Sequence, residues 1–124
     1  MLAQVARKSR QAEVTLIVAL LALSLLIATV GTLTGLALLI GVGAGLGEET
    51  LFRGAVQPVL GIAATSVLFA SMHVQYGPSL LLVYVFLLSI GLGFLRKYIN
   101  TTASFLAHVG YNSLGIILAY FLGI

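Results

Sequence analysis

The sequence has no cysteine, no tryptophan, only two prolines and very little charge among its 124 residues. Without cysteine there can be no disulfide, no thiolate zinc site and no cysteine nucleophile. Charged residues make up 7% of the chain, whereas hydrophobic residues make up 60%. A soluble domain of this size needs far more polar surface to cover its core. The composition therefore predicts an integral membrane protein.

The basic residues, Arg53 excepted, lie beside the apolar segments. One group precedes the first apolar run, and Arg96 with Lys97 follows a later one. Such flanks are typical of the cytoplasmic side, and alternating crossings bring both groups there. We therefore predict a multi-pass protein of the plasma membrane with a cytoplasmic N-terminus. No basic stripe remains for a phosphate backbone, so no nucleic-acid partner is expected.

Apolar runs and turn residues predict an all-α fold: one bundle of five transmembrane helices, in a single domain over residues 1–124. The first helix covers 12–30, the second runs from Gly31 to Pro58, the third covers 62–75, the fourth covers 79–97, and the fifth follows Asn100 to the C-terminus. Pro58 and Gly61 are expected to interrupt the chain between the second and third helices, and the side chain of Asn100 or of the threonines after it can cap the fifth. The first run resembles a signal peptide, but no small-x-small cleavage site follows it. Glycines at 41, 43, 45 and 47 predict close approach of a neighbouring helix.

A few polar residues within these spans need an explanation, because ionisable groups inside a bilayer cost several kcal/mol and usually mark function. They are Glu48, Glu49 and Arg53 on the second helix, His73 on the third, and His108 and Asn112 on the fifth. Glu49 and Arg53 are four residues apart and can pair along one helix face, which leaves Glu48 available.

Each of these residues also has a structural interpretation. The pair of Glu49 and Arg53 can be a buried salt bridge, and His73 can bond a backbone carbonyl. His108 and Asn112 can make hydrogen bonds between helices. Phe69, four residues before His73, is expected to pack in the core. The occurrence of all the polar positions together favours a functional site.

A glutamate beside a histidine in a pocket that excludes bulk solvent can activate a water molecule, as the active site of a hydrolase requires. A second histidine and an asparagine amide one helical turn away can donate to an oxyanion. Two histidines and a glutamate also match the ligands of a catalytic zinc site, with Glu48, His73 and His108 as the ligand candidates. The HExxH spacing is absent. Water activated by zinc and water activated without metal therefore both remain open.

Three motifs occur in order along successive apolar segments: Glu48-Glu49-x-x-x-Arg53, Phe69-x-x-x-His73 and His108-x-x-x-Asn112. This set resembles the CPBP family of intramembrane proteases, also called type II CAAX prenyl endopeptidases or the Abi family, which includes bacteriocin-processing members. The resemblance covers residues 45–115, the catalytic core of the family. Members commonly carry several more helices before the first motif, where this chain is expected to have one.

The resemblance implies an intramembrane endopeptidase in which Glu48 and His73 activate water, while His108 and Asn112 hold the oxyanion. Glu49 and Arg53 would support the helix geometry. It also implies a peptide or protein substrate, with or without a lipid, in contact with membrane lipid. Members are often labelled metalloproteases, and a metal-free glutamate mechanism is also proposed for the family.

Two other classes fit part of the pattern. An ion- or proton-coupled transporter also uses intramembrane glutamate and histidine, although this sequence has no duplicated half. A non-catalytic immunity or interaction protein could retain the same core without using it. The transporter predicts access of water from both sides and no cleavage, and the interaction protein predicts activity that does not depend on Glu48.

Overall fold

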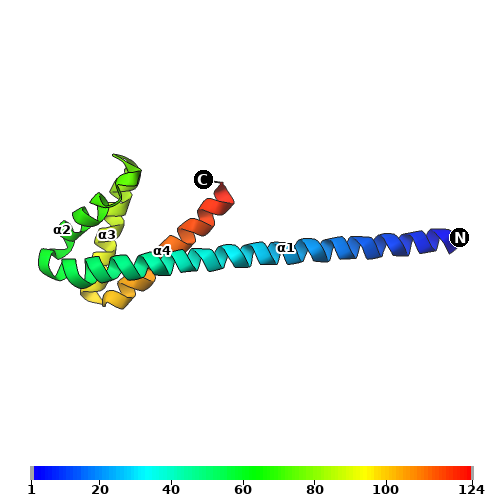
Figure 1. The fold of residues 1–124 in the computed structure, drawn as a ribbon, viewed down its shortest axis with the longest axis horizontal. Coiled ribbons are helices and arrows are strands. Elements are labelled where there is room, and N and C mark those ends of the chain that lie inside the picture. Colours follow the sequence, from blue (N-terminus) through cyan, green and yellow to red (C-terminus); the bar gives the residue numbers. More distant parts are fainter. Residues whose placement is uncertain (1, 124) are drawn as a thin grey trace. The chain divides into compact units, whose positions relative to one another are not determined.

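The computed structural model describes residues 2–123, which form helices and contain no strand (Figure 1). The elements are α1 (Leu2–Glu48), the π-helix η1 (Glu49–Val56), α2 (Gln57–Ser71), the 3-10 turn η2 (Val74–Tyr76), α3 (Leu80–Tyr98) and α4 (Thr101–Leu122). Three stretches of these residues are long and apolar enough to cross a membrane: Arg10–Ser71, Leu80–Tyr98 and Thr101–Leu122. The prediction of an all-α membrane protein is confirmed.

The predicted break at Gly31 is wrong, because α1 is one continuous helix from Leu2 to Glu48. A single glycine costs a helix only about 1 kcal/mol relative to alanine, and no proline accompanies it. The first two predicted helices are thus parts of one helix, and the predicted count of five is too high. The alternation of crossings that placed both basic groups on one side no longer follows from the helix count.

The chain divides into two compact units, residues 1–36 and 37–124. The described part of the first unit belongs to α1, and its side chains from Arg10 to Thr32 are exposed. A helix that is apolar and exposed on all sides is suited to a surrounding of lipid. The predicted polar site lies in the second unit.

In the second unit, η1 leads into α2, where Pro58 stands in the first turn and Gly61 has a φ of 77°. The predicted interruption at Pro58 and Gly61 is therefore confirmed as a kink. The third predicted helix ends earlier than expected, at Ser71 rather than near residue 75. The turn at Gly77, whose φ is 58°, then redirects the chain into α3.

The last two helices follow the prediction closely. The fourth predicted helix corresponds to α3, which carries Arg96 and Lys97 in its last turn. The side-chain oxygen of Asn100 accepts a hydrogen bond of 2.8 Å from the amide of Ala103 and so caps α4. This is the cap expected from the sequence, since asparagine satisfies a free amide at a helix N-terminus.

The core of the second unit forms where α2 packs against α3, while η1 packs against α2 and α4. Its apolar centre consists of Phe52, Phe69, Ala70 and Val85, with Leu82 and Phe86 beside them. Close helix approach uses Gly41 and Gly45, which face Ser113 and Phe105 of α4. Glycines 43 and 47 face open space, so the predicted close-packing face includes two of the four glycines.

Candidate active site

The site begins at the junction of α1 and η1, where the helix widens from the α to the π form. Such π segments are rare and occur frequently at functional sites. Glu49, the first residue of η1, is 1% exposed. Its Oε1 lies 2.9 Å from Nδ1 of His108, and its Oε2 accepts a hydrogen bond from the hydroxyl of Ser104. Both partners come from α4, so Glu49 joins η1 to that helix.

Arg53 lies fully buried one turn after Glu49. Its Nε is 3.5 Å from Oε2 of Glu49, so the predicted ion pair is present. Its Nη2 donates to both the carbonyl and the hydroxyl of Ser89 on α3, each at 3.1 Å. Its guanidinium carbon also stands 4.9 Å from the centre of the Phe69 ring. Arg53 thus links η1 to α3 and α2.

Glu48, the last residue of α1, has a different environment. Its side chain is 34% exposed, and its Oε2 lies 3.8 Å from Nε2 of His108. That oxygen is itself buried and has no hydrogen-bond partner among the described residues. The imidazole of His108 therefore has one carboxylate on each ring nitrogen, with Glu49 bonded and Glu48 not.

The contact with Glu49 indicates which ring nitrogen of His108 donates. A carboxylate can only accept, so the Nδ1 of His108 carries the proton that it donates to Glu49. In the neutral imidazole the Nε2 is then an acceptor that faces the unpartnered oxygen of Glu48. Two acceptors at 3.8 Å need a proton donor between them, and one water at about 2.8 Å from each can donate to both. A water that bonds both atoms requires a small movement of the Glu48 side chain, because its Oε2 is closed to solvent in this conformation.

His73 lies beyond the end of α2 rather than on it, since that helix ends at Ser71. Its Nδ1 is 2.8 Å from the carbonyl oxygen of Phe69, which is the structural contact considered from the sequence. The ring of Phe69 lies against His73, at 4.8 Å between centroids, and against His108, at 6.0 Å. The ring of Tyr76 stacks on the His73 imidazole. Phe69 is 1% exposed and packs in the core, as expected.

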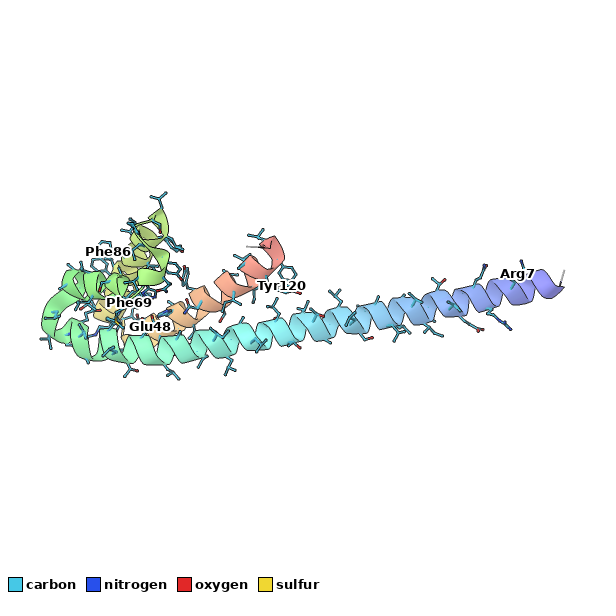
Figure 2. The ribbon with its side chains drawn as sticks, turned by 45° about the horizontal axis from the view of Figure 1, so that its top comes forward. Arg7, Glu48, Phe69, Phe86 and Tyr120 are labelled. Atoms are coloured by element: carbon cyan, nitrogen blue, oxygen red, sulfur yellow. The ribbon has the colours of Figure 1, made fainter. Side chains whose placement is uncertain are left out.

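Asn112 is half-buried on α4, one turn after His108. The structure thus brings Glu48, Glu49, Arg53 and His108 together, and Phe69 contacts both His108 of this group and His73. Figure 2 labels Glu48 and Phe69 in this part of the molecule. Ser89 and Ser104 were not predicted from the sequence. Ser104 precedes His108 by four residues, so helical spacing alone could have placed it on the same face.

The zinc hypothesis requires three ligands that converge. Among the residues that the structure describes, no group of three or more histidine, aspartate or glutamate side chains could hold a metal ion. His73 in particular is turned towards the Phe69 carbonyl. The side chains as placed do not fit a zinc centre, and no step of the chemistry below passes through a metal.

The structure thus defines the class of the protein: an all-helical membrane protein with a buried Glu-Arg-His cluster at a π-helix. The chain matches the family described as type II CAAX prenyl endopeptidase, Rce1-like, over residues 29–114. The match covers more than half of the chain and contains all three motifs, so the protein belongs to this family. Comparison with curated proteins and with solved structures gives no match.

Proposed function

We propose that this protein is an intramembrane endopeptidase that hydrolyses a peptide bond with a water held between Glu48 and His108. The observation that carries the proposal is the buried, unpartnered Oε2 of Glu48, which faces Nε2 of His108 at 3.8 Å. Family membership supports a protease of the CAAX type. We further propose that the protein lies in the plasma membrane with its N-terminus in the cytoplasm, on the basis of its basic flanks.

In this mechanism, Glu48 and His108 each accept a hydrogen bond from the water, so an oxygen lone pair points at the substrate carbonyl carbon. Glu48 takes one proton as the new C–O bond forms. It then gives this proton to the leaving amine nitrogen as the C–N bond breaks. Glu49 acts through His108, because its hydrogen bond fixes the ring orientation and keeps Nε2 as the acceptor.

The remaining predicted residues are proposed to contact the substrate. The amide of Asn112 can donate to the oxygen that becomes negative in the tetrahedral intermediate. His73 has a second ring nitrogen that does not take part in its bond to Phe69. These roles differ from the sequence-based assignment, in which His73 rather than His108 assists Glu48. The closer approach of His108 to Glu48 is the reason for the change.

The substrate class is proposed from an apolar cavity beside the core of the second unit. An apolar cavity of about 330 Å³ lies between α2 and α3. It is lined by Val67, Ala70, Ser71, Leu82, Val83 and Phe86. We propose that the substrate is a peptide with an apolar or lipidated segment, since such a segment can occupy an apolar cavity in the membrane.

The test is proteolysis of a membrane-peptide library in liposomes, with each peptide supplied with and without a C-terminal prenyl group. Glu48→Gln keeps the size of the side chain but removes the base, and cleavage should fall by 10² or more, on the order of a lost general base. His108→Ala should also lose cleavage. Glu13→Gln is the matched control, because it neutralises an exposed acid of α1, and it should cleave like the wild type.

Parallel arms of the same experiment test the alternatives. A chelator and added zinc test whether cleavage depends on a metal ion. Cleavage that is equal in wild type, Glu48→Gln and His108→Ala would contradict the proposal. Ion or proton flux without cleavage would instead favour a transporter, and a biological activity that survives Glu48→Gln would favour an interaction protein.

A further inference from the structure

The π-helix η1 leaves one of its carbonyls without a main-chain donor. The amide of Gln57 donates to the carbonyl of Phe52, five residues earlier, which is the π-helical pattern. The next carbonyl is that of Arg53, and its partner in this pattern would be the amide of residue 58. Residue 58 is proline, which has no N–H. The carbonyl of Arg53 therefore cannot be satisfied in the regular way.

A side chain from another helix takes the place of the missing amide. The Nε of Arg96, in the last turn of α3, donates to the carbonyl oxygen of Arg53 at 3.0 Å. Arg96 is half-buried, unlike its exposed neighbour Lys97. Backbone carbonyls inside a protein are almost always paired, so this contact satisfies a group that would otherwise remain unsatisfied.

The carbonyl that Arg96 satisfies belongs to the residue that organises the site. The side chain of Arg53 pairs with Glu49 and is anchored on Ser89. Glu49 in turn bonds His108, whose other nitrogen faces Glu48. A change of η1 from the π to the α form would rotate the residues that precede η1 relative to those that follow it. The pairing of Arg96 with Arg53 opposes that change.

We infer that Arg96 is a positioning residue: its Nε–H replaces the amide that Pro58 lacks and thereby holds η1 in the π-helical form that sets Glu48 and Glu49 against His108. The catalytic consequence rests on the proposed function, whereas the structural coupling does not. The competing explanation is that Arg96 is only a basic anchor at the end of a membrane span. In that case Lys97, the adjacent basic residue, would behave in the same way.

The variants separate the donor from the charge. Arg96→Met removes both and keeps an apolar chain of similar length. Arg96→Gln removes the charge but places an amide N–H at the same number of bonds from the backbone as the arginine Nε. Lys97→Met is the matched control for the loss of one basic group. Pro58→Ala supplies the missing amide and should make Arg96 dispensable.

Two measurements do not require any enzymatic activity. Hydrogen exchange in detergent micelles should speed up in residues 49–57 by about tenfold in Arg96→Met, the size expected from loss of a charge-assisted hydrogen bond. The imidazole nitrogen resonances of His108, assigned with a His73→Gln variant, should shift in Arg96→Met. Neither change is expected in Lys97→Met, and Arg96→Gln should lie near the wild type.

The decisive comparison is Arg96→Met with and without Pro58→Ala. The effects on exchange and on His108 should largely disappear in the Pro58→Ala background. Equal effects in both backgrounds, or equal effects of Arg96→Met and Lys97→Met, would overturn the inference. If cleavage is detected, kcat should fall on the order of 10²-fold in Arg96→Met with KM nearly unchanged, since the misplaced group acts on chemistry. Absence of cleavage in the wild type would refute the proposed function and leave the two spectroscopic tests valid.

Discussion

At the scale of the residue, the two adjacent glutamates have different surroundings because they lie on different faces of one helix. Glu49 is buried and shared among Arg53, Ser104 and His108, so its negative charge is compensated. Glu48 has a buried oxygen with no partner in the described part of the chain. Buried polar groups are rarely left unsatisfied without a functional reason. In the proposed mechanism, Glu48 is therefore the carboxylate that acts as the base.

Ser104→Ala should destabilise the protein by about 1–3 kcal/mol, because it removes a donor from a buried carboxylate. Thermal unfolding in detergent micelles measures the effect. Ser113→Ala is the matched control on the same helix, since Ser113 is also buried and donates only to the backbone carbonyl of Ala37. A loss of stability in Ser113→Ala as large as in Ser104→Ala would argue against a special role for the bond to Glu49.

The candidate site could be predicted from the sequence only in part. Charged residues are so rare in this apolar chain that Glu48, Glu49 and Arg53 are recognised as candidates by their occurrence alone. The spacing of Glu49 and Arg53 predicts the ion pair that is present. Serine is common in membrane helices and bonds its own backbone, so nothing in its occurrence marked Ser104. The position of His73 depends on the helix end at Ser71, and helix ends are poorly determined by sequence.

At the scale of the element, the contact of α2 with α3 depends on the absence of a side chain at Gly93. A Cβ there would lie 2.9 Å from Cγ2 of Ile62 and 3.3 Å from Oε1 of Gln57. Ile62 is β-branched and has little rotamer freedom, so it cannot easily move away. Gln57 also donates from Nε2 to the carbonyl of Gly93 at 2.9 Å. Together with the bond from Arg53 to Ser89, this contact fixes η1 and the start of α2 along α3.

Gly93→Ala should therefore destabilise the second unit, with an expected cost of about 1–3 kcal/mol for an overpacked contact. Gly91→Ala on the same helix is the control, because a Cβ at Gly91 meets no atom within 4 Å. It should be neutral or stabilising, since alanine is the better helix former by about 1 kcal/mol. Unfolding in detergent compares the two, and a similar loss in both would contradict the packing argument.

Element boundaries followed the sequence where a specific local signal exists. Asn100 caps α4 as predicted, and Pro58 with Gly61 marks a kink as predicted. Gly31 gave a false boundary, because glycine alone neither blocks a helical hydrogen bond nor forces a turn. The π form of η1 was not predicted, since it depends on tertiary partners such as Arg96 and His108 that lie far along the chain.

At the scale of the whole molecule, the absence of cysteine allows the proposed orientation to be measured directly. Gln11→Cys and Ile99→Cys each introduce a single thiol near one basic group of an otherwise cysteine-free chain. If both groups lie in the cytoplasm, a membrane-impermeant reagent should label both thiols only from that side. Labelling from opposite sides would refute the proposed topology, and the labelling of solubilised protein controls for access to each thiol.

The position of Phe69 has a consequence for the movement of protons. Its ring contacts both imidazoles, and a hydrocarbon ring can neither accept nor pass on a proton. Phe69 therefore passes no proton between His73 and His108 where its ring contacts them. A proton at Glu48 or His108 does not reach His73 through that ring. The imidazoles of His73 and His108, although both contact Phe69, can therefore serve separate steps of the proposed hydrolysis.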